Sequence, residues 1–222
     1  MSWFAAVDIY CERMGEAFWA EPINAISNLS ILLAGLAGFY LSRQAFYKKS
    51  VWLVSAMAVL TSVGSFLFHT TAQVWSMWSD ILPILFLMLS FFGFVLLFVF
   101  GWKGWAVASS LLAFTAVGFI LQNEAIYEGL PFGSLNGSLG YVHAWLALLA
   151  IAYWPISETG RKTFSHSMWW ALFVFSVSLF FRSIDNSLCE AWPFGTHFIW
   201  HTLNGFLIFL LIRAMVRLGP NR

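Results

Sequence analysis

The sequence predicts an all-α membrane protein, built as a bundle of seven transmembrane helices. Of the 222 residues, 60% are hydrophobic and only 9% are charged, whereas a soluble domain carries about 25% charged residues. The chain also contains long runs without charge, each close to the roughly 20 apolar residues that cross the hydrocarbon core. These observations exclude a soluble globular fold. The formal net charge of +1 provides no basic surface for nucleic acid, so none is expected as a partner.

Seven runs are expected to cross the membrane within a single domain of residues 1–222. Residues 1–21 precede them as an acidic extracytoplasmic leader. Each run avoids charged residues, and tryptophans fall near many of the ends, as an interfacial aromatic belt requires. In order, the runs are Pro22–Leu41, Val51–His69, Asp80–Phe100, Trp105–Gln122, Leu139–Ile156, Met168–Ile184 and Gly195–Ile212.

Basic residues predict the orientation of this bundle. Lysine and arginine concentrate in the short cytoplasmic connections of membrane proteins. Nine of the eleven basic residues follow the first, third and fifth runs or lie in the C-terminal tail; they are Arg43, Lys48, Lys49, Lys103, Arg161, Lys162, Arg213, Arg217 and Arg222. We therefore expect a multi-pass membrane protein with its N-terminus outside and its C-terminus in the cytoplasm.

Both cysteines fall in connections on the outer side. Cys11 precedes the first run and Cys189 follows the sixth. Because a non-cytoplasmic compartment permits disulfides, we expect a Cys11–Cys189 bridge. The alternative is two unconnected thiols.

Three histidines are expected at one depth near the outer surface. His69 ends the second run, and His197 and His201 open the seventh, four residues apart on one helix face. Ionisable residues inside membrane helices are costly and mark functional sites. Three histidines with an open fourth position are the ligand set of catalytic zinc. The sequence therefore predicts a zinc site formed by the second and seventh helices.

Two more polar residues are expected beside this site. Ser65 precedes His69 by one helical turn, and a hairpin over residues 70–79 would return Asp80 to the depth of His69. With a zinc-activated water, Asp80 would act as the general acid and base, and Ser65 would stabilise an oxyanion. Two alternatives stay open: Asp80 orients a histidine ligand, or Ser65 bonds back to its own helix. The chemistry is hydrolysis of a lipid amide or ester near the membrane surface, close to the extracytoplasmic face.

A third polar group lies at the outer end of the sixth run. Arg182 and Asp185 are three residues apart and are followed by Asn186. We expect a structural ion pair along the helix. Recognition of a lipid head group is the alternative.

Together these motifs resemble the alkaline ceramidase family, part of the wider CREST group of seven-helix hydrolases that includes the adiponectin receptors. The resemblance extends from about Asp8 to Asn204. It rests on Ser65-x3-His69, Asp80 and His197-x3-His201, with Tyr10-Cys11-Glu12, Glu21-Pro22-Ile23-Asn24, Ser27-Asn28-Leu29, Arg182-Ser183-Ile184-Asp185-Asn186 and Cys189-Glu190. It implies zinc-dependent cleavage of the ceramide amide to a sphingoid base and a fatty acid. His69, His197 and His201 would hold zinc, with Asp80 as the acid/base and Ser65 as the oxyanion partner.

The resemblance also implies a second metal and a bridged cysteine pair. Eukaryotic members hold calcium in the acidic N-terminal segment, where Asp8, Glu12 and Glu21 are the available ligands here. Oxygen-rich clusters suit calcium. The alternative is a solvated acidic leader. Cys11 and Cys189 match positions that the family can bridge.

Other functions stay open at this stage. A non-catalytic seven-helix receptor or structural protein would use zinc only to tie the second and seventh helices. A hydrolase of another N-acyl lipid would share the site and differ in substrate. A transporter is disfavoured because titratable residues are almost absent from the cytoplasmic half of the runs.

Overall fold

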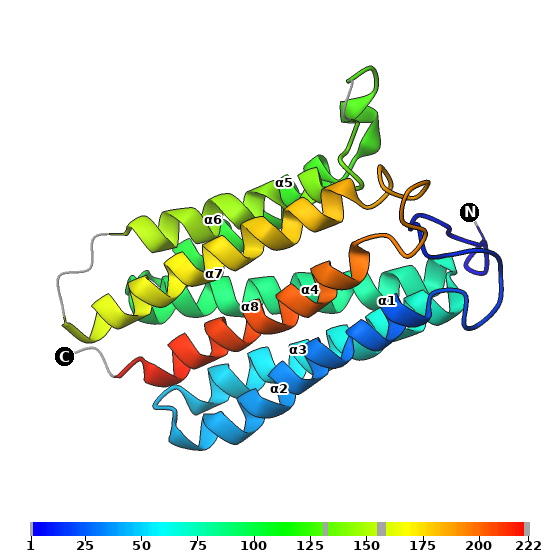
Figure 1. Cartoon of the computed structure of the whole chain (residues 1–222). Helices are drawn as coiled ribbons and strands as arrows, with labels where there is room; N and C mark the ends of the chain where they lie inside the picture. The colour runs from blue at the N-terminus through cyan, green and yellow to red at the C-terminus, as the bar shows by residue number, and fades with distance from the viewer. Residues whose placement is uncertain (1, 131–132, 155–158, 220–222) are drawn as a thin grey trace.

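The charge-free runs of the sequence form long helices aligned along one axis (Figure 1). The structure is a computed structural model that describes residues 2–130, 133–154 and 159–219. Its α-helices are α1 (Pro22–Ser27), α2 (Leu29–Leu41), α3 (Lys48–Thr71), α4 (Val74–Phe94), α5 (Gly104–Leu121), α6 (Val142–Tyr153), α7 (Thr159–Ile184) and α8 (His197–Arg217). A π-helical turn, Val95–Val99, continues α4, and 3-10 turns occur at Ser42–Gln44, Glu124–Tyr127 and Ser138–Tyr141.

Six helical segments of the described chain are long and apolar enough to cross a membrane. They are Pro22–Gln44, Lys48–Thr71, Val74–Val99, Gly104–Leu121, Thr163–Ile184 and His197–Arg217, and Ser138–Tyr153 is a shorter apolar helix. The N-terminal segment and the C-terminal end of α8 lie at opposite ends of the bundle (Figure 1). The helical character of the prediction is confirmed, and the apolar helices are consistent with a multi-pass membrane protein; the number of seven crossings stays a prediction. The direction of the bundle in the membrane stays a prediction.

The first predicted crossing is divided into two helices at Asn28. The carbonyl oxygen of Asn24 accepts hydrogen bonds from the Ser27 hydroxyl, at 2.7 Å, and from the Asn28 side-chain amide, at 3.0 Å. Such side-chain bonds compete with the helical ladder and favour a break. The break places Ser27 close to α8, where it contacts the candidate site.

The hairpin between α3 and α4 is much tighter than predicted. Gln73 and Ser76 form a capping box that starts α4 at Val74, six residues before the predicted start, and Ala72 makes the turn with φ of 44°. The predicted loop over residues 70–79 is therefore wrong. Because both helices continue to this turn, Asp80 lies beside Ser65, one turn deeper than His69.

A glycine lets these two helices approach each other at that level. A Cβ atom on Gly64 would lie 1.8 Å from the carbonyl oxygen of Ser79, a separation that no side chain tolerates. The Ser79 hydroxyl in turn donates to the Gly64 carbonyl at 3.3 Å. Ser65 follows Gly64 on α3, and Asp80 follows Ser79 on α4. The close contact between the two helices therefore brings Ser65 and Asp80 together.

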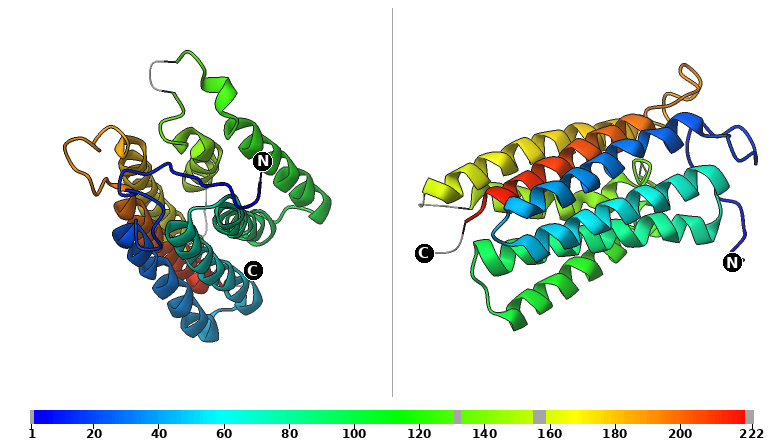
Figure 2. Two further views of the ribbon diagram at one scale, coloured as in Figure 1. Left: turned by 90° about the vertical axis from the view of Figure 1, so that its right-hand side faces the viewer. Right: turned by 90° about the horizontal axis from the view of Figure 1, so that it is seen from below.

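The N-terminal segment runs across one end of the bundle, as the end-on view in Figure 2 shows. Val7 donates its N–H to the carbonyl of Ala72, and Val74 donates to Ala5, so the segment is fastened to the α3–α4 turn. Below it, α3 packs against α2 and α4, and α8 packs against α2 and α7. The ends of α3 and α8 therefore meet beneath the N-terminal segment.

Candidate metal centre

Three buried histidines meet where α3 and α8 converge. His69 comes from the last turn of α3, and His197 and His201 come from the first two turns of α8. One ring nitrogen of each lies within 4.8 Å of the others. The three residues are only 0%, 2% and 3% exposed, respectively. In the described part of the chain this is the one group of three or more potential ligands that converges in this way.

His69 is oriented by a carboxylate from the N-terminal segment. Its Nδ1 atom lies 2.6 Å from Oε2 of Glu21. Burial raises the pKa of Glu21, but the hydrogen bond to His69 and the charge of Arg13 outweigh burial and hold the pKa below its usual range. An ionised carboxylate only accepts, so Nδ1 carries the proton. The lone pair of His69 is therefore on Nε2, which is buried and has no partner among the described residues.

His201 is oriented by the break between α1 and α2. Its Nδ1 atom lies 2.8 Å from the Ser27 hydroxyl and 3.1 Å from the carbonyl oxygen of Asn24. Because a carbonyl only accepts, Nδ1 carries the proton here as well. Nε2 of His201 is thus free to bind a metal, in the arrangement that metal-binding histidines usually have.

His197 is held by an aromatic ring and by its own backbone. The ring of Tyr10 stacks on it with centroids 3.7 Å apart, and its Nδ1 atom is buried without a partner in the described chain. Oδ1 of Asp185 accepts the N–H groups of Thr196 and His197 at 2.6 and 2.9 Å. A carboxylate at this position satisfies the free N–H groups at the start of α8. Asp185 therefore fixes where the helix that carries two of the histidines begins.

Gly195 makes room for this capping carboxylate. Its φ of +61° is in the left-handed region that favours glycine. A Cβ atom there would lie 2.2 Å from Oδ1 of Asp185 and 2.7 Å from the Cβ of Cys11. The tight turn before α8 thus depends on the absence of a side chain.

The acidic leader is partly a buried component of the site. Glu12 accepts the N–H groups of Ile23 and Asn24, each at 2.7 Å, and so caps α1. Arg13 forms an ion pair with Glu21 and donates to the carbonyl of His69 at 2.9 Å. A fully solvated leader, the alternative reading of this segment, is therefore wrong for these residues.

The possible calcium ligands do not come together as a cluster. Asp8 is exposed, whereas Glu12 and Glu21 are buried and engaged by protein donors. Calcium binding by these three residues stays a prediction. The Glu12 carboxylate instead accepts hydrogen bonds at the N-terminus of α1, and the Glu21 carboxylate contacts His69.

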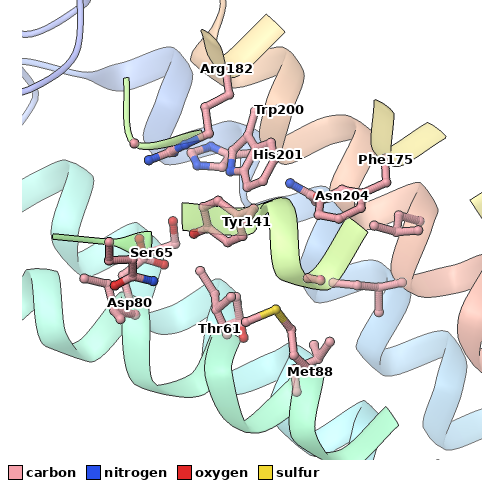
Figure 3. Close-up of a pocket in the computed structure, with 18 of the residues that line it drawn as sticks. Thr61, Ser65, Asp80, Met88, Tyr141, Phe175, Arg182, Trp200, His201 and Asn204 are labelled. Atoms are coloured by element: carbon pink, nitrogen blue, oxygen red, sulfur yellow. The ribbon is translucent and has the colours of Figure 1, made fainter. Parts of the chain in front are cut away.

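Asp80 and Ser65 lie together on the wall of a cavity beside the histidines (Figure 3). Oδ1 of Asp80 is buried and has no hydrogen-bond partner among the described residues. The partners found for the rings of His69 and His201 are Glu21, Ser27 and the Asn24 backbone, and no hydrogen bond from Asp80 to a histidine ring is found in the described chain. Its free oxygen faces a space where a reacting molecule can bind.

This cavity is polar at one end and apolar along most of its length. It has a volume of about 380 Å³. His197, His201 and Asp80 line it near the N-terminal segment, and apolar side chains of α4, α6 and α8, such as Met88 and Leu211, line the rest. From His197 to Leu211 the α8 axis advances by about 21 Å. The shape suits a molecule with a polar reacting group and a long apolar chain.

The expected ion pair between Arg182 and Asp185 is not formed. Asp185 directs Oδ1 to the start of α8 and Oδ2 to the backbone N–H of Cys11, at 3.2 Å. The Arg182 guanidinium instead lies over the rings of Tyr10, Tyr141 and Trp200. The backbone N–H groups at a helix start compete successfully for the carboxylate.

The predicted disulfide is confirmed, because Cys11 and Cys189 are bonded. The bridge joins the N-terminal segment to the connection that follows α7, across 178 residues of sequence. It lies beside Asp185 and therefore close to the support of His197. The disulfide therefore links the N-terminal segment, which contacts His69 and His197, to the connection between α7 and α8.

A comparison with known protein families identifies the family of the chain. The chain matches the ceramidase family over residues 8–219, a match that includes all three histidines, Ser65 and Asp80. The chain belongs to the ceramidase family. Membership implies a membrane-embedded hydrolase that acts on the amide bond of a lipid. Among curated proteins, none matches the chain. The resemblance inferred from the sequence motifs is confirmed.

Sequence reasoning missed the residues that orient this ceramidase-family site. Tyr10 and Ser27 enter the sequence prediction only as motif members, and Glu21 enters it as a possible calcium ligand; none of them has a predicted role at the histidines. The signal that the sequence offers for Glu21 is its place in the Glu21-Pro22-Ile23-Asn24 motif, directly before the first run. The contacts of Tyr10 and Ser27 depend on how the N-terminal segment folds over the bundle, which local patterns do not contain.

Proposed function

We propose that this ceramidase-family protein is a zinc-dependent hydrolase of N-acyl lipids, with ceramide as the first candidate substrate. The observation that carries the proposal is the convergence of His69, His197 and His201 at the polar end of an apolar cavity. Two of these rings present buried nitrogens without partners in the described chain. Buried polar atoms normally have partners, so a ligand at this position is expected.

The donor set fits zinc better than other common metals. Neutral imidazole nitrogens are zinc ligands, whereas calcium and magnesium require oxygen. Three protein ligands also leave a fourth position open for water or substrate, which is typical of catalytic rather than structural zinc. When bound, zinc lowers the pKa of a coordinated water molecule to about 7.

Asp80 is proposed as the group that moves the proton. Its unpartnered Oδ1 would accept a proton from the attacking water and deliver it to the departing amine nitrogen. The amide and one water molecule would thereby yield a free amine and a carboxylic acid, here a sphingoid base and a fatty acid. General acid–base catalysis of this kind contributes about 10²- to 10⁴-fold to a rate.

Ser65 is proposed as the donor to the carbonyl oxygen of the substrate. Its hydroxyl lies next to Asp80 on the cavity wall (Figure 3). In this position it would donate a hydrogen bond as the carbonyl oxygen gains negative charge, the role of an oxyanion-hole donor. The apolar remainder of the cavity would hold a lipid chain and exclude water from it.

The experiment is lipid mass spectrometry on the purified protein. The protein is incubated with a panel of N-acyl lipids, first as prepared, then after treatment with a chelator, and then after zinc is restored. We expect an amine and a fatty acid from at least one lipid, loss of both with the chelator, and recovery with zinc. Full activity in a zinc-free preparation would refute zinc dependence. No turnover of any lipid, with thermal stability that depends on zinc, would favour a structural zinc tie.

A further inference from the structure

Arg182 is a buried cation that the proposed chemistry does not use. It lies two residues before the end of α7 and is only 9% exposed. Its guanidinium carbon lies 5.2 to 5.8 Å from the ring centroids of Trp200, Tyr141 and Tyr10. The side chain lines the cavity at the same end as the histidines (Figure 3).

No carboxylate forms an ion pair with this guanidinium in the described part of the chain; the Asp80 carboxylate interacts with it electrostatically but not at ion-pair distance. The ion pairs found there are Arg13–Glu21 and His69–Glu21, and Asp185 is engaged by backbone N–H groups. Nη1 of Arg182 donates to the Tyr10 hydroxyl at 3.3 Å, and Nε is buried without a partner. A tyrosine hydroxyl is neutral at neutral pH, so Tyr10 supplies no negative charge.

An unpaired charge of this kind is costly in a protein interior. Buried charges are normally paired or fully hydrogen-bonded. Three aromatic faces offset part of the cost by cation–π attraction, but they accept none of the N–H hydrogen bonds in the guanidinium plane. Arg182 therefore has donors available for an acceptor that enters the cavity.

The position of Arg182 determines which part of a lipid it would meet. The apolar part of the cavity extends along α8 away from His197. A lipid with its chain in that part and its amide at the histidines has its polar end at the level of Arg182. A planar guanidinium binds carboxylate and phosphate oxygens through two parallel hydrogen bonds.

We propose that Arg182 binds an anionic head group, a carboxylate or a phosphate, so that the protein acts on N-acyl lipids whose polar end is negatively charged. This inference rests on the proposed function for the position of the amide. It narrows the N-acyl lipids of that proposal to those with an anionic head group, a class that excludes neutral ceramide and so replaces it as the first candidate. Arg182 is a specificity residue here, because it contacts the substrate away from the bond that breaks.

A matched pair of lipids tests the proposal on the wild-type protein. N-oleoylglycine and N-oleoylethanolamine share the acyl chain and the amide, and they differ in a carboxylate against a hydroxyl. Hydrogen bonds to charged groups are the stronger class, so we expect a kcat/KM about tenfold or more higher for N-oleoylglycine, mainly through KM. Equal values for the two lipids would overturn the proposal.

Three variants test whether a preference for the carboxylate lipid depends on Arg182. Arg182→Gln is expected to remove the preference by raising KM for N-oleoylglycine much more than KM for N-oleoylethanolamine. Arg182→Lys keeps the charge without the planar fork and is expected to retain part of it. Arg43→Gln is the matched control, because Arg43 is exposed and its guanidinium lies over one ring, that of Tyr40. A preference that survives in Arg182→Gln would overturn the assignment.

Binding without turnover separates this inference from the proposed function. Two ether lipids, (oleyloxy)acetate and 2-(oleyloxy)ethanol, carry the same pair of head groups and have no amide to cleave. We expect tighter binding of the carboxylate lipid by the wild-type protein, even if no amide is hydrolysed. If oleate alone competes through Arg182 and the head groups bind equally, the guanidinium serves the acid product and the proposal is overturned.

Discussion

Glu21 reaches from the N-terminal segment to His69, where its Oε2 atom lies 2.6 Å from Nδ1. The carboxylate thereby fixes the tautomer of the histidine and leaves Nε2 for a metal. Arg13 holds the other carboxylate oxygen. The N-terminal segment therefore orients His69, a candidate metal ligand that lies on α3.

The substitution Glu21→Gln tests this relationship. We expect zinc affinity to fall by about 10- to 100-fold, the usual cost of losing the partner of a metal-binding histidine. Affinity is measured by competition with a chromophoric chelator, and thermal unfolding monitors folding. Glu16→Gln is the control, because Glu16 is exposed in the same segment. Unchanged zinc affinity in Glu21→Gln would show that the carboxylate is dispensable.

The substitution Asp80→Asn separates proton transfer from metal binding. The amide cannot accept the proton, so kcat is expected to fall by about 10²- to 10⁴-fold, while zinc content stays at one per chain. Lipid turnover and elemental analysis of the same preparation provide the two readouts. Asp8→Asn, at an exposed position, should leave both unchanged. A loss of zinc in Asp80→Asn would instead place this carboxylate among the metal ligands.

The substitution Gly64→Ala tests whether helix proximity sets the active pair. The added Cβ would collide with the Ser79 carbonyl and push α3 and α4 apart, which separates Ser65 from Asp80. We expect a lower thermal unfolding midpoint and a lower kcat with zinc still bound. Gly104→Ala adds the same atom in open space and should have little effect. Wild-type behaviour of Gly64→Ala would mean that the contact is not needed.

Removal of the disulfide by Cys11→Ser with Cys189→Ser should reduce stability. A bridge that closes so long a loop contributes about 2–5 kcal/mol, because it restricts the unfolded chain and ties the N-terminal segment over the site. Thermal unfolding in detergent measures the change. The reduced wild-type protein should match the double variant, and a reductant should not alter the variant further. Equal midpoints with and without reductant in the wild type would refute this contribution.

Helix positions were predictable because the membrane imposes a simple pattern on sequence. Long apolar runs gave the crossings, and the spacing of His197 and His201 placed both rings on one helix face. The ends of the helices were less predictable where polar residues have local hydrogen-bond partners. The sequence pattern predicts a loop at Ser76 and Ser79, yet their hydroxyls are satisfied by nearby groups of the turn and helix, so α4 includes them.

The support around the histidines was harder to predict, because it depends on tertiary contacts. Glu21 and Asp185 were expected to bind calcium and to pair with Arg182, respectively, since charge and spacing were the available information. The fold instead places Glu21 at a histidine ring and Asp185 at the free N–H groups of α8. Only the path of the N-terminal segment across the bundle creates the first of these contacts.

Zinc K-edge X-ray absorption of the purified protein tests the central claim most directly. We predict about one zinc ion per chain, with four nitrogen or oxygen neighbours at about 2.0–2.1 Å and the outer-shell pattern of three imidazoles. His201→Ala should remove one imidazole from that pattern or abolish binding. A protein that turns over lipid without zinc, or zinc in an environment without imidazole, would contradict the account.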